Sequence, residues 1–367
     1  MPALPIWDRF IRAFHWALVA SMAVAAVTGF LLGAEALVWH LIGGLAAAAL
    51  VVARLIWGVW GGGAARFASF IPTPTAVLAH LRGLRGGGAR YLGHNPLGAL
   101  MVLALIAVIL LIALTGLMVL GGELKTGPLA MLSYDLGDTA KELHEPLAIA
   151  LLVMVAAHIG GVIFESRHHG ENLARSMISG AKPARPGDIA PAPVPARPGR
   201  ALAAGVVVAL GLAGGAAAMM ARPVPGAPVA VWDATTRDEC TACHIGYHPS
   251  LMPAASWQAL MAKLDDHFGE DASLPPATTG AITDWLLAHA AETADTLPAH
   301  RLARVDAAAP YTLTETPFWK RRHGEIPDAV FARPAIKSRA NCAACHADAE
   351  TGWFSPLAID IPKETLK

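Results

Sequence analysis

Charged residues and cysteines are both scarce in this sequence. Only 15% of the 367 residues are charged and 54% are hydrophobic, a balance that excludes an ordinary soluble domain and is typical of a chain with membrane spans. The 28 basic residues equal the 28 acidic ones. The chain therefore lacks the excess of positive charge that would indicate a nucleic-acid partner. The four cysteines all lie beyond residue 239, which excludes a disulfide framework from the long region before them.

Five apolar runs are long enough to cross a hydrocarbon core, which takes about 20 residues of helix. The first is followed directly by another, so it predicts a membrane helix rather than a cleaved signal peptide. The five predicted spans are 15–34, 37–60, 96–121, 143–164 and 201–221.

Charge alternates between the connections of these spans. The segment 54–95 contains five arginines and no acidic residue, whereas 122–143 contains four acidic residues and two lysines; 165–200 is basic again. Basic connections stay in the cytoplasm. The pattern therefore predicts a cytoplasmic N-terminus and, after five crossings, a C-terminal part on the periplasmic side of a bacterial inner membrane.

Composition divides the chain into four parts. Residues 1–182 form the predicted membrane domain of four helices, and 183–200 is a Pro- and Ala-rich cytoplasmic linker. Residues 201–221 form a fifth membrane helix, and 222–367 a periplasmic domain with no long alternating strand pattern. The predicted fold class is mostly α: a transmembrane four-helix bundle, a fifth membrane helix and a mainly helical, loop-rich C-terminal domain.

Two C-x-x-C-H motifs use every cysteine in the chain. They are Cys240-Thr241-Ala242-Cys243-His244 and Cys342-Ala343-Ala344-Cys345-His346. In such a motif two thiols bond covalently to one haem and the adjacent histidine binds its iron. A zinc site or a redox dithiol is the alternative for a single motif. Two copies in the compartment where haem c is attached favour two covalent haems c.

The other axial ligand of each haem c stays open at this point. His248 lies four residues after His244, too close to reach the opposite side of the same haem. Met252 or Met261 would give a histidine–methionine site with a higher potential. The remaining histidines of the domain are His267, His289, His300 and His323.

Histidines in membrane spans are rare and usually functional. His144 and His158 lie 14 residues apart in the fourth span, which gives about 21 Å of rise with only about 40° of rotation. Both therefore face one interior at two depths. Matching depths from the predicted topology pairs His15 with His158 and His40 with His144, as two bis-histidine haem b sites. Interfacial histidines without a ligand role are the alternative.

Two further histidines, His80 and His94, have no partner at matching depth and are predicted to be structural. The fifth span has no histidine and is predicted to be an anchor. Glycines such as Gly29, Gly43 and Gly44 beside the histidines would leave room for a porphyrin.

Residues 5–182 resemble the bacterial cytochrome b561 / Ni,Fe-hydrogenase b-type cytochrome family. That resemblance implies that His15, His40, His144 and His158 hold two non-covalent haems b and that the protein exchanges electrons with a quinol or quinone. The residues that carry it are Trp7-Asp8-Arg9, Phe14-His15-Trp16, Arg54-Leu55-Ile56-Trp57-Gly58, Tyr91-Leu92-Gly93-His94-Asn95-Pro96, Leu143-His144-Glu145, His158 and Glu171-Asn172-Leu173.

Residues 238–362 resemble the periplasmic diheme cytochromes c. The resemblance implies bis-histidine ligation, with His267 opposite His244 and His323 opposite His346, although the two distal partners could be exchanged. It is carried by the two C-x-x-C-H motifs with Tyr247-His248-Pro249, Leu251-Met252-Pro253, Ser256-Trp257, the run Asp266 to Ala272, Trp319 and His323.

These features predict an electron carrier surrounded by membrane lipid. It would connect the quinone pool with a soluble periplasmic cytochrome or other haem protein, in either direction. The activity compatible with that role is quinol:cytochrome c-type oxidoreduction, and no catalytic side chain is predicted. The alternatives are a redox enzyme acting on a small molecule such as superoxide, the cytochrome b subunit of a hydrogenase-like dehydrogenase, and a ligand-binding haem sensor.

Overall fold

The computed structural model describes residues 3–83 and 89–363 and confirms a mostly helical fold. Within that part of the chain, five helices are long and apolar enough to cross a membrane. They are α1 (Arg9–Phe30), α2 (Leu37–Trp60), α4 (Pro96–Gly122), α5 (Tyr134–His168) and α7 (Pro198–Met220).

Helices α1 and α5 begin well before their apolar runs. The Asp8 carboxylate accepts a hydrogen bond from the Ile11 N–H at 2.7 Å and so caps α1 before the polar residues that precede its apolar stretch. Helix α5 begins at Tyr134, where its first turns carry Asp135 and Asp138. Hydrophobic periodicity locates the membrane-crossing part of a helix, whereas caps decide where the helix starts.

The chain forms two compact units. One comprises Met1–Leu117 with Ala140–Ala218, and the other Met118–Thr139 with Met219–Lys367. The connection between α4 and α5 therefore belongs to the same unit as the C-terminal domain. Within it, Gly122 and Gly137 pass so closely that a Cβ on Gly122 would lie 2.6 Å from Gly137 Cα.

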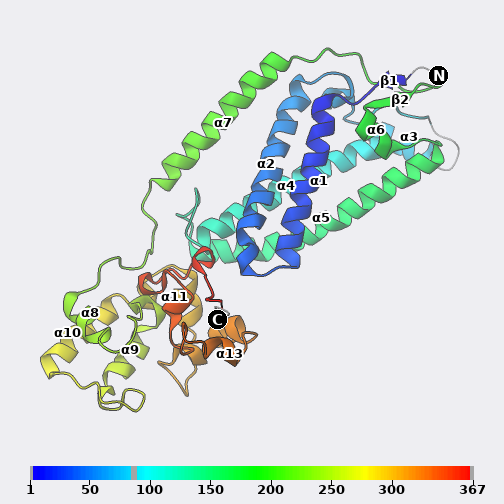
Figure 1. The fold of residues 1–367 in the computed structure, drawn as a ribbon. Coiled ribbons are helices and arrows are strands. Elements are labelled where there is room, and N and C mark those ends of the chain that lie inside the picture. The colour runs from blue at the N-terminus through cyan, green and yellow to red at the C-terminus, as the bar shows by residue number, and fades with distance from the viewer. Residues whose placement is uncertain (1–2, 84–88, 364–367) are drawn as a thin grey trace. The chain divides into compact units, whose positions relative to one another are not determined.

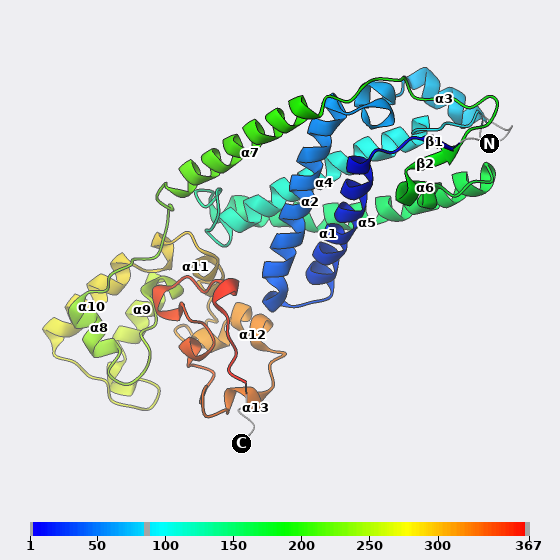
Figure 2. The same ribbon diagram turned by 45° about the horizontal axis from the view of Figure 1, so that its top comes forward.

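The first unit contains α1, α2, α4 and α5. In both views α1 and α2 run side by side, and α4 and α5 cross them at an angle (Figures 1 and 2). Ala47 and Val51 of α2 pack against Ile106 and Ile109 of α4. Gly43 lets α2 approach α1, because a Cβ there would lie 2.9 Å from the Ser21 carbonyl oxygen.

Short elements close one end of this bundle. Strand β1 (Ala3–Pro5) pairs antiparallel with β2 (Ala181–Pro183), and the helices α3 (Pro74–Gly83) and α6 (Leu173–Ser179) lie in the connections. The predicted linker has no helix or strand between Pro183 and α7, yet it is held by backbone hydrogen bonds: Leu92 N–H donates to Ile189 O and Arg197 N–H to Trp60 O.

The second unit contains six short helices and several 3-10 turns. Its largest core cluster joins Met252, Trp257, Met261, Ile282 and Leu286. The helices are α8 (Ala234–Cys240), α9 (Ala254–Met261), α10 (Pro276–Ala288), α11 (Leu297–Leu302), α12 (Pro317–His323) and α13 (Asp328–Phe331).

Candidate haem-binding sites

Each C-x-x-C-H histidine faces a second histidine. The ring centres of His244 and His267 lie 6.1 Å apart with a 22° angle between the planes. Those of His346 and His323 are also 6.1 Å apart, at 64°. An iron with an imidazole on each side, bound at about 2 Å per nitrogen, separates the two ring centres by about 6 Å. Both pairs therefore fit bis-histidine ligation, with the distal partners in the order that the resemblance implies.

Backbone carbonyls orient two of these rings. His244 Nδ1 lies 2.7 Å from Ile245 O, and His323 Nδ1 lies 3.1 Å from Trp319 O, one turn earlier in α12. A metal-binding histidine commonly donates its second N–H in this way, which fixes the ring and leaves Nε2 for the metal.

The competing ligands of the domain are engaged elsewhere. His248 is fully buried, with Nδ1 on Ser250 Oγ at 2.8 Å and Nε2 on Val229 O at 3.0 Å. His300 Nε2 lies 2.9 Å from Asp295 Oδ1. Met252 and Met261 belong to the apolar core, and His289 Nδ1 lies 2.8 Å from Trp285 O. None of these five side chains faces a C-x-x-C-H histidine.

The four cysteines, all in the described part of the chain, form no disulfide. Burial raises the pKa of Cys342 to about 11 and also raises the pKa of Cys240 and Cys345. A redox dithiol needs the opposite, a thiol whose pKa is lowered. The environment therefore argues against that alternative.

In the bundle, the ring centres of His40 and His144 lie 6.2 Å apart, again the spacing that one iron between them requires. His40 Nδ1 lies 2.9 Å from Ala25 O of α1, and His144 Nδ1 lies 3.0 Å from Thr115 Oγ1 of α4. In both rings Nε2 is left for a metal.

Two glycines make room for these rings. A Cβ on Gly29 would lie 3.0 Å from the His40 ring, and one on Gly116 would lie 3.1 Å from His144 Cε1. Gly44 has open space around it instead. Of the glycines considered from the sequence, Gly29 thus accommodates a histidine ring, whereas Gly43 serves helix packing.

The second predicted pair in the bundle is His15 and His158. These two side chains interact electrostatically, and the His15 Nδ1 atom is shielded from solvent without a hydrogen-bond partner. Their role as ligands of one haem stays a prediction.

Comparison with known proteins separates the chain into two parts. Residues 6–180 match the prokaryotic cytochrome b561 family, and residues 236–354 match the dihaem cytochrome c family. The diheme cytochrome c from Rhodobacter sphaeroides is 44% identical over 34% of this chain and 98% of that protein, with a TM-score of 0.30. The diheme cytochrome type c from Shewanella baltica OS155 is 35% identical over 35% of this chain and 92% of that one, with a TM-score of 0.29.

The chain belongs to both families, as a fusion of a prokaryotic cytochrome b561 with a dihaem cytochrome c. For the second part, membership rests on identity over almost the whole length of the solved proteins. No curated protein matches the chain.

The fusion is a membrane electron-transfer protein whose families use haem b and haem c. The cytochrome b561 part contributes the helices with paired histidines, and the dihaem cytochrome c part contributes both C-x-x-C-H motifs. Thr115 and Gly116, which hold and accommodate His144, were not predicted from the sequence. The signal for them is a polar residue and a glycine side by side within an otherwise apolar run.

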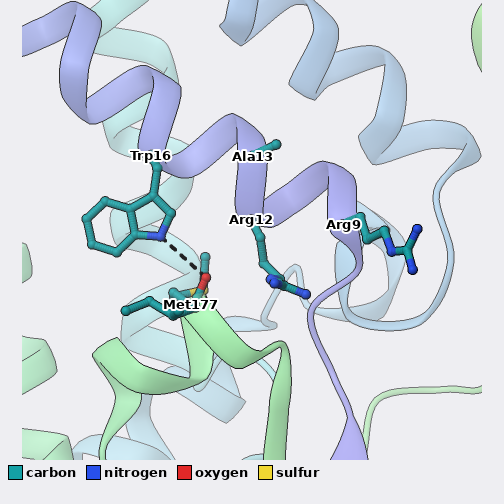
Figure 3. Close-up of a pocket in the computed structure, with 6 residues that line it drawn as sticks. Arg9, Arg12, Ala13, Trp16 and Met177 are labelled. Atoms are coloured by element: carbon teal, nitrogen blue, oxygen red, sulfur yellow. Dashed lines mark hydrogen bonds between the residues drawn. The ribbon is translucent and has the colours of Figure 1, made fainter.

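A surface cavity of about 340 Å³ lies between the first turns of α1 and helix α6 in the cytochrome b561 part (Figure 3). The Trp16 Nε1–H donates to Met177 O at 3.4 Å across it. Its other lining residues are Arg9, Arg12, Ala13 and Ile178.

Proposed function

We propose that this fusion carries electrons between the quinone pool and a soluble periplasmic redox partner through two haems b and two haems c. The observation that carries the proposal is the recurrence of one geometry: three histidine pairs have ring centres 6.1 to 6.2 Å apart. When bound, a haem supplies reversible one-electron exchange at its iron.

The protein's own residues would then do three things. Cys240, Cys243, Cys342 and Cys345 anchor the two haems c. The imidazoles of His15 with His158, and of His40 with His144, hold the two haems b within the bundle. Carbonyl and hydroxyl acceptors orient four of the ligand rings, those of His40, His144, His244 and His323, through Nδ1, which limits their movement when an electron arrives.

Two histidines per iron leave no position for a small molecule to bind. This favours an electron carrier over a ligand sensor or an enzyme that binds superoxide at an iron. The basic cytoplasmic connections support an orientation with the N-terminus in the cytoplasm and the dihaem cytochrome c part in the periplasm. Its partner would then be a soluble cytochrome or another haem protein.

The purified protein in lipid nanodiscs, mixed anaerobically with a quinol, tests the proposal. Absorbance bands of haem b and of haem c should both develop, and the haem c band should fail to develop in a His144→Ala variant that has lost its haem b. An equal rate of haem c reduction in that variant would contradict the route. Carbon monoxide added to the reduced wild type should leave the spectrum unchanged, whereas binding would favour a sensor or an enzyme.

A further inference from the structure

Arg54 of α2 is a buried cation without a bound carboxylate. Its side chain is 3% exposed, and its Nη1 atom has no hydrogen-bond partner. Its guanidinium lies 4.6 Å from the Phe67 ring centre and 5.9 Å from that of Phe70. Burying an ionised group is very costly unless an anion and hydrogen bonds compensate it, and aromatic faces compensate only part of that cost.

The acidic side chain that acts on Arg54 already has two hydrogen-bond donors. Asp8 acts on Arg54 electrostatically, but its two oxygens accept from the Ile11 N–H and the Trp57 Nε1–H, both at 2.7 Å.

His94 is the second donor without a partner at this place. Its ring lies between Phe70, at 4.4 Å between centres, and Trp7, at 4.9 Å. Its Nδ1 atom is shielded from solvent and has no hydrogen-bond partner. His94 interacts electrostatically with Arg54 and also with His158. The two unmatched groups are therefore neighbours, since both contact the Phe70 ring, and His94 lies within electrostatic range of a predicted haem b ligand.

We propose that Arg54 and His94 bind a propionate carboxylate of the haem b that His15 and His158 hold. The inference rests on the proposed haem b sites. A non-covalent haem brings carboxylates with it, and a guanidinium fork matches a carboxylate with two parallel hydrogen bonds. The aromatic wall of Trp7, Phe67 and Phe70 encloses these donors, which suits a group inside the bundle better than a lipid phosphate.

Redox titration of Arg54→Gln tests the assignment. Without the guanidinium the propionate charge is uncompensated and stabilises the ferric state. The midpoint potential of one haem b should therefore fall, while the other haem b and both haems c keep theirs. The shifted component should be the one that His15→Ala removes.

Arg54→Lys should shift it less, and His94→Gln should alter the propionate bands in resonance Raman spectra. Arg82→Gln, which removes an exposed charge on α3, is the matched control and should shift nothing.

A full haem content with unchanged potentials in Arg54→Gln and unchanged propionate bands in His94→Gln would overturn the proposal. Loss of copurified phospholipid with unchanged potentials would assign Arg54 to a lipid phosphate instead. If Arg54→Gln does not accumulate, Arg54→Lys and His94→Gln decide the question. Failure of quinol to reduce the wild type would refute the proposed function and leave the potential shift as a separate result.

Discussion

Lys125 and Asp295, 170 residues apart in the chain, form a buried ion pair within the unit that holds the dihaem cytochrome c part. Lys125 Nζ lies 2.6 Å from Asp295 Oδ2, and the lysine side chain is only 1% exposed. Asp295 also accepts from the Tyr134 backbone N–H at 3.0 Å and faces His300 Nε2 at 2.9 Å. Lys125 adopts a left-handed backbone with φ of 49°, a costly conformation that surrounding contacts must maintain.

Breaking this pair should destabilise the segment between α4 and α5, and the loss should be larger when Asp295 is replaced than when Lys125 is replaced. Asp295→Asn leaves the Lys125 ammonium buried without a counter-ion and should cost about 3–5 kcal/mol. Lys125→Met leaves a carboxylate that is 28% exposed and still hydrogen-bonded, so about 1–3 kcal/mol is expected. Hydrogen exchange of residues 126–134 measures both losses.

The double variant Lys125→Met/Asp295→Asn should lose less than the two single losses combined, because it removes both charges. Arg301→Met is the control: its pair with Asp138 is 24% and 32% exposed, and its loss should cost at most about 1 kcal/mol. Strictly additive losses would show that the pair does not act as a unit.

The ion pair should also fail in acid. Burial opposes ionisation of Asp295, but hydrogen bonds from Lys125, His300 and the Tyr134 backbone hold its pKa below the ordinary value. A lowered pKa contributes stability that is complete above the unfolded value of about 4 and is lost as the pH falls through the folded value. The stability difference between wild type and Asp295→Asn should be present above the unfolded pKa and should shrink as the pH falls through the lowered folded pKa. A difference that does not shrink would contradict this origin.

Acid-acetone extraction should remove half of the haem and leave half on the polypeptide. The reason is that thioether bonds survive the treatment whereas histidine ligation does not. Pyridine haemochrome spectra of the two fractions give the ratio. Haem found only on the polypeptide would contradict the haem b sites.

Single substitutions should assign the haem b ligands. His40→Ala and His144→Ala should remove one spectral component, because their rings lie 6.2 Å apart, and His15→Ala and His158→Ala should remove the other. Low-temperature absorbance and potentiometry distinguish the two. Loss of the same component from His15→Ala and His40→Ala would show that the pairing is wrong.

The distal ligands of the haems c have their own test. His267→Ala and His323→Ala should each retain both covalent haems and gain one high-spin centre that binds carbon monoxide, because the cysteine bonds are untouched while one iron position opens. His289→Ala is the matched control and should stay low-spin. The reverse outcome, with His289→Ala opening an iron and His267→Ala not, would refute the assignment.

The features that could be predicted from the sequence are those that depend on the spacing of residues along the chain. The C-x-x-C-H motifs, the five spans and the pairing of His40 with His144 depend on repeats and depths that are readable along the chain. Contacts such as Lys125–Asp295 and Thr115–His144 join residues far apart and leave no periodic signal. His94 was predicted to be structural for want of a partner at matching depth, but its unmatched Nδ1 beside Arg54 becomes visible only when α2 and the segment before α4 are brought together.

The chain passes between its two compact units after Leu117, after Thr139 and after Ala218. Because the units are covalently connected, electron transfer between them should have a different kinetic order from transfer between two separate proteins. Two separate cytochromes must meet by diffusion, at a rate that depends on both concentrations, whereas joined partners meet at an effective concentration on the order of millimolar whatever the expression level. Transfer between the units should therefore be first-order and unaffected by dilution. In the proposed route, the step to a soluble partner would be the second-order one, and that step alone should respond to ionic strength through diffusional encounter.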